Sequence, residues 1–187
     1  MTALVSTFTV LLSIFTIAGD AVVIFLLATF VFKELRKKHP ILHAAHRFFR
    51  DKGVIFAFVV AMAGTLSSLF YSEIAHFAPC LLCTWQRIFL YPQVILLGAA
   101  LWYKNKKFHV YSILLSVIGG VIALYNTYIQ FSGSSILPCG ISVSCTKRYF
   151  LEFGYITIPT MALTGFLLIL LLLIAIRMEK EPEAKSF

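Results

Sequence analysis

The stretch Gly53–Ser72, GVIFAFVVAMAGTLSSLFYS, contains no charged residue. A helix of about 20 apolar residues, each rising about 1.5 Å, crosses the roughly 30 Å hydrocarbon core of a bilayer. The rest of the chain has the same character: 60% of its 187 residues are hydrophobic, 13% are charged, and its mean hydropathy is +0.90. This composition excludes a disordered chain, argues against a soluble globular domain and predicts an integral membrane protein.

Four further apolar runs lie on either side of this stretch. They are Thr2–Phe32, Ile88–Tyr103, Phe108–Phe131 and Phe153–Ile176. Short connections join the four consecutive runs from Gly53–Ser72 to Phe153–Ile176. They predict that helices next to each other in the chain pack as antiparallel neighbours. We therefore expect an all-α integral membrane protein, with a four-helix transmembrane bundle preceded by one additional N-terminal transmembrane helix. Asp20 lies within that first helix, where a carboxyl group should face other helices or water.

The positions of the basic residues predict the orientation of the chain. Apart from Arg87, Lys147 and Arg148, all 16 Lys and Arg residues lie between the first and second runs, between the third and fourth, or after the fifth. The positive-inside rule places those segments in the cytoplasm, with the N-terminus outside and the C-terminus inside. This pattern predicts a multi-pass protein of the cell membrane. Since the net charge of +8 lies in loops that flank the lipid bilayer, we expect no binding to nucleic acid.

All four cysteines fall on the predicted extracytoplasmic side, where disulfides can persist. The first pair is Cys80 and Cys83, and the second is Cys139 and Cys145. Two structural disulfides are one interpretation of this pattern. A structural zinc site is another, although the unequal spacings do not match the paired knuckles of common zinc sites.

The first pair is a C-x-x-C motif, which is unlike a structural staple. A bond within so small a ring removes little entropy from the unfolded chain, whereas reversible exchange is a known use of this spacing. Cys80 should open a helix whose free N–H groups favour a thiolate, and Arg87 follows Cys83 by one helical turn. The chain has no flavin, dinucleotide or nucleotide-binding motif. A lipid-soluble quinone, which reaches the site through the bilayer, fits as the electron acceptor.

The residues around this motif resemble a known family. Pro79–Ile88, PCLLCTWQRI, followed by Tyr91-Pro92, is similar to the signature of the DsbB/BdbC disulfide-bond formation proteins. Leu69–Ile74, Pro138–Cys145 and Phe153–Pro159 also resemble the short BdbC-type members. The resemblance covers roughly Gly53–Arg177.

This resemblance implies a membrane thiol:quinone oxidoreductase that supports disulfide bond formation in secreted proteins. Its partner would be an extracytoplasmic thiol oxidase of the thioredoxin fold (DsbA-like), and its cofactor a membrane quinone, either menaquinone or ubiquinone. Both cysteine pairs would be catalytic on the extracytoplasmic side, with Cys139 and Cys145 exchanging with the partner. Cys80 and Cys83 would then take the electrons, and Cys83 would pass them to the quinone.

The resemblance also implies two quinone-binding residues and no metal site. Arg87 matches the quinone-contacting arginine of the family, and Gln86 stands where some members have glutamate. The second cysteine pair is separated by only five residues, which is shorter than in the best-known member.

The expected organisation has four parts. An extra N-terminal transmembrane helix (1–32) precedes a basic cytoplasmic loop (33–52), a DsbB-like four-helix redox domain (53–177) and a cytoplasmic tail (178–187). A non-enzymatic membrane scaffold with two structural disulfides is an alternative, and a metal-binding membrane protein is another. A vitamin-K-epoxide-reductase-like enzyme is a third, but it usually carries the loop pair before the C-x-x-C, and here the order is reversed.

Overall fold

A computed structural model of the chain describes residues 2–31, 47–49, 51–103, 107–133 and 144–178. The long elements are α1 (Thr2–Val31), α4 (Gly53–Leu69), η1 (Phe70–Ile74), α5 (Leu81–Tyr103), α6 (Lys107–Ser132) and α7 (Ile158–Met178). No β-strand occurs within these ranges, so the prediction of an all-α protein is confirmed. The expected cytoplasmic tail and most of the expected basic loop lie outside the described residues.

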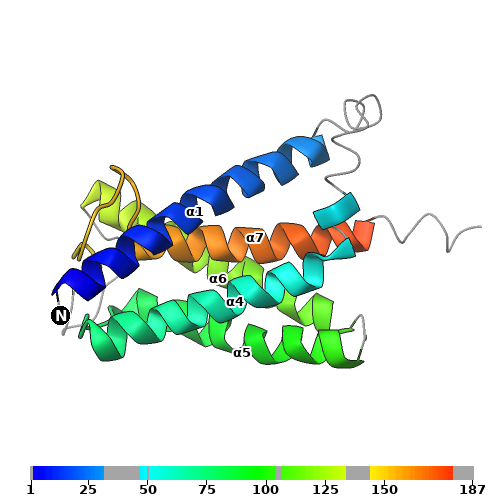
Figure 1. Cartoon of the computed structure of the whole chain (residues 1–187), viewed down its shortest axis with the longest axis horizontal. Coiled ribbons are helices and arrows are strands. Elements are labelled where there is room, and N and C mark those ends of the chain that lie inside the picture. The colour runs from blue at the N-terminus through cyan, green and yellow to red at the C-terminus, as the bar shows by residue number, and fades with distance from the viewer. Residues whose placement is uncertain (1, 32–46, 50, 104–106, 134–143, 179–187) are drawn as a thin grey trace, which may run out of the picture.

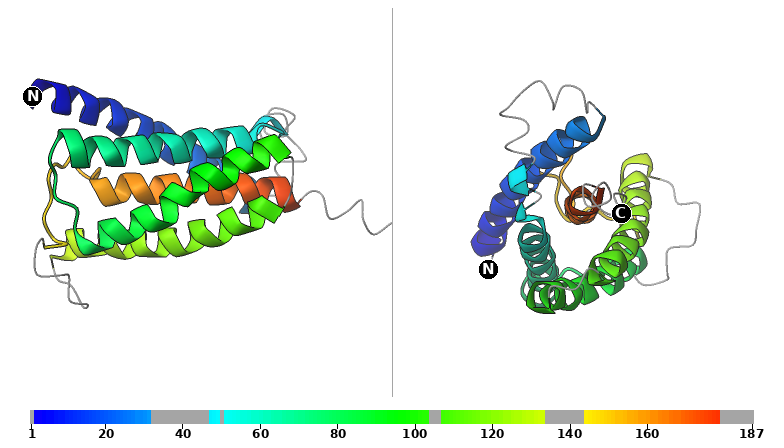
Figure 2. Two further views of the ribbon diagram at one scale, coloured as in Figure 1. Left: turned by 90° about the horizontal axis from the view of Figure 1, so that it is seen from below. Right: turned by 90° about the vertical axis from the view of Figure 1, so that its right-hand side faces the viewer.

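Helix α7 occupies the centre of the molecule, and α1, α4, α5 and α6 surround it in an open arc (Figures 1 and 2). Neighbours along the chain pack side by side, α4 on α5, α5 on α6 and α6 on α7. Helix α1 packs on α7 and completes one side of the arc. The arrangement is the four-helix bundle with one additional helix that the sequence predicts.

Four of these elements are long and apolar enough to cross a membrane: α1, α4 together with η1, α6 and α7. Helix α5 has 23 residues, and it lies between α4 and α6 over a comparable length. Gln86, Arg87 and Gln93 make it less apolar than its neighbours. Two of these polar side chains, Gln86 and Gln93, are buried inside the protein, which is where a helix in a bilayer places such groups.

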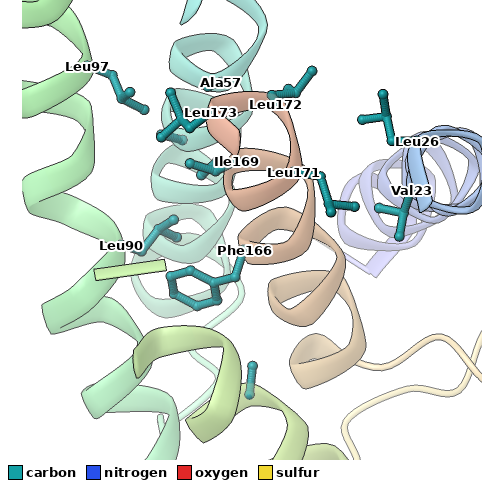
Figure 3. Close-up of a cluster of buried hydrophobic side chains, with 12 residues drawn as sticks. Val23, Leu26, Ala57, Leu90, Leu97, Phe166, Ile169, Leu171, Leu172 and Leu173 are labelled. Carbon is teal, nitrogen blue, oxygen red and sulfur yellow. The ribbon is translucent and has the colours of Figure 1, made fainter. Parts of the chain in front are cut away.

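The core forms where α7 meets the other helices. Phe166, Ile169 and Leu173 of α7 are almost completely buried and face α4 and α5, whereas Leu171 of α7 lies beside Val23 of α1 (Figure 3). Gly119 of α6 lies directly against the Phe166 ring, because a Cβ added there would come within 2.4 Å of it. Packing of this kind, a large side chain against a glycine, lets helices approach closely where lipid supplies no hydrophobic drive.

Helix α1 presents a face of small and polar residues to α7. The Asp20 carboxylate accepts hydrogen bonds from Thr164 Oγ1 at 2.6 Å and from the Tyr155 hydroxyl at 2.9 Å. The Tyr71 hydroxyl donates to Thr9 Oγ1 at 3.2 Å. Interhelical hydrogen bonds are a usual means of joining membrane helices. These contacts place Asp20 against another helix, as the sequence predicts.

The helix ends differ in places from the predicted apolar runs. Helix α5 begins at Leu81, so Cys83 and Arg87 are helical from the first turns. Helix α7 begins at Ile158 rather than Phe153, because Phe153 and Gly154 have φ angles of 48° and 79° and form a tight turn. Pro159 then lies in the first turn of α7, where a missing N–H costs nothing.

Helix α4 continues into a π-helical segment, η1, which the sequence did not predict. Such segments are rare and are frequent at functional sites. Here the segment carries Tyr71, which bonds to α1, and Ser72, which bonds to α5.

Candidate functional site

Cys80 and Cys83 lie together at the start of α5. Both are free thiols, and their sulfur atoms are 2.7 Å apart. The Cys83 backbone N–H donates to Cys80 Sγ at 3.3 Å, so the Cys80 side chain occupies the place of an N-cap acceptor. Thr84 adds a hydrogen bond from its hydroxyl to the Cys80 carbonyl at 3.2 Å. The helix start therefore fixes the two sulfurs in contact.

The surroundings of Cys80 favour its thiolate. The hydrogen bond from the Cys83 thiol has the largest effect and, with the Leu82 and Cys83 backbone N–H groups and the Asn126 amide, lowers the pKa of Cys80 to about 6. Burial opposes this shift but does not cancel it. The sequence predicted such a thiolate from the helix N-terminus, and the backbone contribution agrees with that reasoning.

Asn126 of α6 is a site residue that the sequence analysis missed. Its side-chain amide donates to Cys83 Sγ at 3.5 Å and reaches Cys80 Sγ at 4.0 Å. It is 0% exposed, and within the part of the chain that the structure describes its Oδ1 has no hydrogen-bond partner. The available signal was an amide within an otherwise apolar membrane run, since such groups are costly in lipid and commonly functional.

One cysteine of the second pair, Cys145, lies beside the first pair's surroundings at the start of α5. Cys145 is disulfide-bonded and 1% exposed, and it packs in one buried cluster with Cys80 and Ile129. Cys83 lies against the same cluster. Cys139 lies outside the described residues. Cys145 thus shares one buried cluster with the inner pair.

The loop that follows Cys145 is fastened to the loop that precedes Cys80. The Tyr149 hydroxyl donates to the Ala78 carbonyl at 2.7 Å, and its ring stacks on Phe77 with centroids 4.4 Å apart. Arg148 donates to the Gln130 carbonyl at the end of α6. These bonds hold the two cysteine loops together over the end of the bundle where α5 and α7 begin, which we call the cysteine end.

Arg87 lies close to the thiols along α5 but its guanidinium is directed toward α4 and η1. Nη1 donates to Ser72 Oγ and Nη2 to the Ser68 carbonyl, each at 3.2 Å. The cation that the sequence placed one turn from a thiolate is therefore fixed by two oxygen acceptors, and the lowered pKa of Cys80 has other causes. The Arg87 side chain also lines the wall of a large groove.

This groove runs between α1, α4 and α7 and has a volume of about 860 Å³. Cys80, Cys83, Gln86 and Arg87 line one part of it, and most of its other lining residues are apolar. Gln86 is 5% exposed, and its Nε2 donor has no hydrogen-bond partner among the described residues. A ligand with a carbonyl oxygen would satisfy that donor. The residues present therefore fit a quinone, with its polar ring beside the thiols.

Comparison with known proteins assigns this site to a family. Residues 50–176 match the family model described as "Disulfide bond formation protein DsbB". The chain belongs to the DsbB family. The matched region contains the four-helix bundle and both cysteine pairs, and α1 lies outside it.

Relatives within this family carry the same description. The chain is 40% identical over 129 residues to a "Probable disulfide formation protein" of Chlamydia caviae, which covers 68% of this chain and 93% of that protein. It is 39% identical over 128 residues to "Disulfide bond formation protein C" of Bacillus subtilis, and the aligned region covers 66% of this chain and 91% of that protein. No solved structure is significantly similar. Membership of the DsbB family makes the chain a membrane-embedded oxidoreductase of disulfide bond formation.

Proposed function

We propose that this protein reoxidises an extracytoplasmic thiol oxidase of the thioredoxin fold and passes the electrons to a membrane quinone. The single observation that carries the proposal is that Cys145 and Cys80 share one buried cluster at the end of an apolar groove. A buried disulfide, an activated dithiol and a lipid-facing groove in direct succession make a path for two electrons from a protein to a lipid-soluble acceptor.

The partner delivers its electrons to the second cysteine pair. A thiolate of the reduced partner attacks the disulfide formed by Cys139 and Cys145, and the partner's second thiol then resolves the mixed disulfide. The partner leaves oxidised, and Cys139 and Cys145 become thiols. We assign Cys139 as the attacked sulfur because Cys145 is 1% exposed and is inaccessible to a folded protein.

The second pair then reduces the first. Cys145 attacks the Cys80 sulfur of an oxidised Cys80–Cys83 pair, and Cys83 departs as a thiol or thiolate. Attack by Cys139 on the mixed disulfide restores the outer disulfide and leaves Cys80 and Cys83 reduced. The lowered pKa of Cys80 makes its sulfur a good leaving group in this last step.

The first pair faces the quinone site. A quinone held in the groove would supply an acceptor for the two electrons and two protons that the Cys80–Cys83 dithiol gives up when it forms its disulfide. Cys83 lines the groove and delivers the electrons, while the Asn126 amide stabilises negative charge on its sulfur. Gln86 Nε2 and the Arg87 guanidinium are the donors that hold the quinone carbonyls. Menaquinone and ubiquinone both meet these requirements.

The basic loops place this chemistry outside the cytoplasm. With the expected basic loop on the cytoplasmic side, the cysteine end of the bundle faces the extracytoplasmic space. The N-terminus is then outside and the C-terminus inside. The four parts predicted from the sequence, 1–32, 33–52, 53–177 and 178–187, follow the same topology.

The test is quinone reduction by purified full-length protein in lipid nanodiscs, with a reduced thioredoxin-fold oxidase as electron donor. We expect steady turnover by the native protein and none by Cys80→Ser or Cys83→Ser, because either change removes the dithiol. Thr146→Ala, a substitution in the same loop as Cys145 at a residue that does not line the groove, serves as the control. Turnover at the native rate in both cysteine variants would refute the proposal.

A further inference from the structure

The groove beside the thiols has three walls, and one of them is α1. Seven residues of α1 line the groove: Phe8, Leu12, Phe15, Thr16, Ala18, Gly19 and Val22. They occupy one face of that helix, because they recur at helical spacing. The opposite wall comes from α4, and α7 forms the floor with residues from Pro159 to Leu172. At about 1.5 Å per residue, this floor is roughly 20 Å long.

The groove has a polar end and an apolar end. The polar end contains the two thiols, the Arg87 guanidinium and the unpartnered Gln86 Nε2. Away from it, the walls consist largely of phenylalanine, leucine, valine and alanine, down to Phe49, Phe56 and Leu172. A molecule with a hydrogen-bond-accepting ring and a long hydrocarbon chain matches this division. The length suits a chain of several isoprene units and far exceeds the length of the ring alone.

Contacts hold α1 to α7 along one side of the groove, and Phe25 of α1 also packs on Phe49 at the apolar end, with ring centroids 6.1 Å apart. Asp20 bonds to Thr164 and Tyr155, and Gly19 lies against Thr164 and Leu168 of α7. Near its N-terminus, the Phe8 ring packs at a tilt on Phe70, with ring centroids 3.9 Å apart. Beyond that point α1 packs on α7 and not on α4, and the two helices diverge toward the other end of the molecule (Figures 1 and 2). The groove therefore opens sideways between α1 and α4, toward lipid.

We propose that α1 is one wall of the binding site for the isoprenoid tail of the quinone, and that the quinone enters laterally between α1 and α4. This inference rests on the proposed function and adds a role for the helix that lies outside the family match. The ring stays at Gln86 and the thiols, and the tail lies along α1. Selection by tail length is thus a property that the additional helix gives to this chain.

The first test compares two quinones with the same ring, menaquinone-4 and the tail-less menadione, with dithiothreitol as electron donor. In Ala18→Trp, the indole narrows the groove from α1, and we expect the KM for menaquinone-4 relative to menadione to rise by about tenfold, which corresponds to about 1.4 kcal/mol. Ala21→Trp is the matched control, because Ala21 is also exposed on α1 but does not line the groove. Its KM ratio should stay at the native value.

The second test is independent of turnover. Menaquinone with a photoreactive azide on its tail is cross-linked to full-length protein in nanodiscs, and the labelled peptides are identified by mass spectrometry. We expect labels on α1 between Phe8 and Val22, and their loss when unmodified menaquinone-4 is added. Labels confined to α5 and α6 would overturn the inference. So would labelling of α1 by a photoreactive phospholipid that menaquinone-4 does not displace, because the groove would then be a lipid site.

The outcomes separate this inference from the function on which it rests. If the native protein reduces both quinones and Ala18→Trp leaves their KM ratio unchanged, the tail site on α1 is wrong and the proposed function stands. If the native protein reduces neither quinone, the proposed function fails and this inference fails with it.

Discussion

The Cys80 sulfur accepts a hydrogen bond from the Cys83 thiol and another from the Cys83 backbone, and this environment is directly testable. With the pKa of Cys80 lowered from its ordinary value of 9.0 to about 6, the thiolate persists until the pH falls below about 6. Alkylation of the reduced protein by iodoacetamide should therefore have a pH midpoint near 6 at Cys80, followed by peptide mass spectrometry. Cys83→Ala removes the strongest cause and should move that midpoint upward. A native midpoint near 9 would contradict the geometry.

The role of Asn126 can be tested by the same alkylation measurement, and the chain offers a matched control variant. Asn126→Leu removes the amide that donates to both sulfurs, so we expect the alkylation midpoint of Cys80 to rise and the rate of quinone reduction to fall. Gln93→Leu is the matched control: Gln93 is also a buried amide at the α5–α6 interface, but it bonds to Ser116 and Phe89 rather than to sulfur. An equal shift in both variants would indicate a general packing effect.

Two substitutions of Arg87 distinguish the effect of its charge from the effect of its hydrogen-bond geometry. Two nitrogens of its guanidinium donate hydrogen bonds, one to Ser72 Oγ and one to the Ser68 carbonyl. A lysine ammonium cannot reproduce this planar pair of donors. We expect Arg87→Ala to raise the KM for quinone strongly, and Arg87→Lys to restore it only in part. The far-UV circular dichroism of both variants should match that of the native protein. An unchanged KM in both would reduce Arg87 to a structural link between α5 and α4.

At the scale of the elements, the contact between α6 and α7 offers two adjacent glycines with opposite expectations. A Cβ at position 119 would lie 2.4 Å from the Phe166 ring, whereas one at position 120 meets Phe166 at an ordinary 3.6 Å. Gly119→Ala should cost about 1–3 kcal/mol through overpacking, and Gly120→Ala close to nothing. Thermal unfolding in detergent, monitored by circular dichroism, measures both. Equal midpoints would mean that the helices separate readily at Gly119.

The sequence predicted the helices well because an apolar run in a bilayer has few alternatives to a helix. It also predicted that the C-x-x-C pair opens a helix whose N–H groups favour a thiolate, and the position and lowered pKa of Cys80 agree with this. It could not predict the partners of a side chain across helices. Asn126 carries no motif, and the direction of Arg87 toward Ser68 depends on how α4 and α5 cross. The π-helical turn of η1 and the sideways position of α1 likewise arise from packing between distant residues.

At the scale of the whole molecule, we propose that the second cysteine pair, the first cysteine pair and the groove follow one another along a single path for electrons. The outer loop is fastened to the bundle by Tyr149 and Arg148, so Cys145 stays beside Cys80 without a large excursion. The five-residue separation within the second pair is therefore compatible with the exchange between the pairs that we propose. The partner must still reach the second cysteine pair, and we expect Cys139 to be more accessible to it than Cys145.

Partner capture tests this asymmetry in the intact protein. In Cys145→Ser, the Cys139 thiolate can attack the disulfide of an oxidised thioredoxin-fold oxidase, which forms a mixed disulfide and releases one partner thiolate. In Cys139→Ser the remaining Cys145 is buried, so we expect adducts in Cys145→Ser and few in Cys139→Ser. After quenching with N-ethylmaleimide, non-reducing gels and mass spectrometry measure the two yields. Adducts mainly through Cys145 would reverse the assignment, because the loop would then have to lift away from Cys80 to meet its partner.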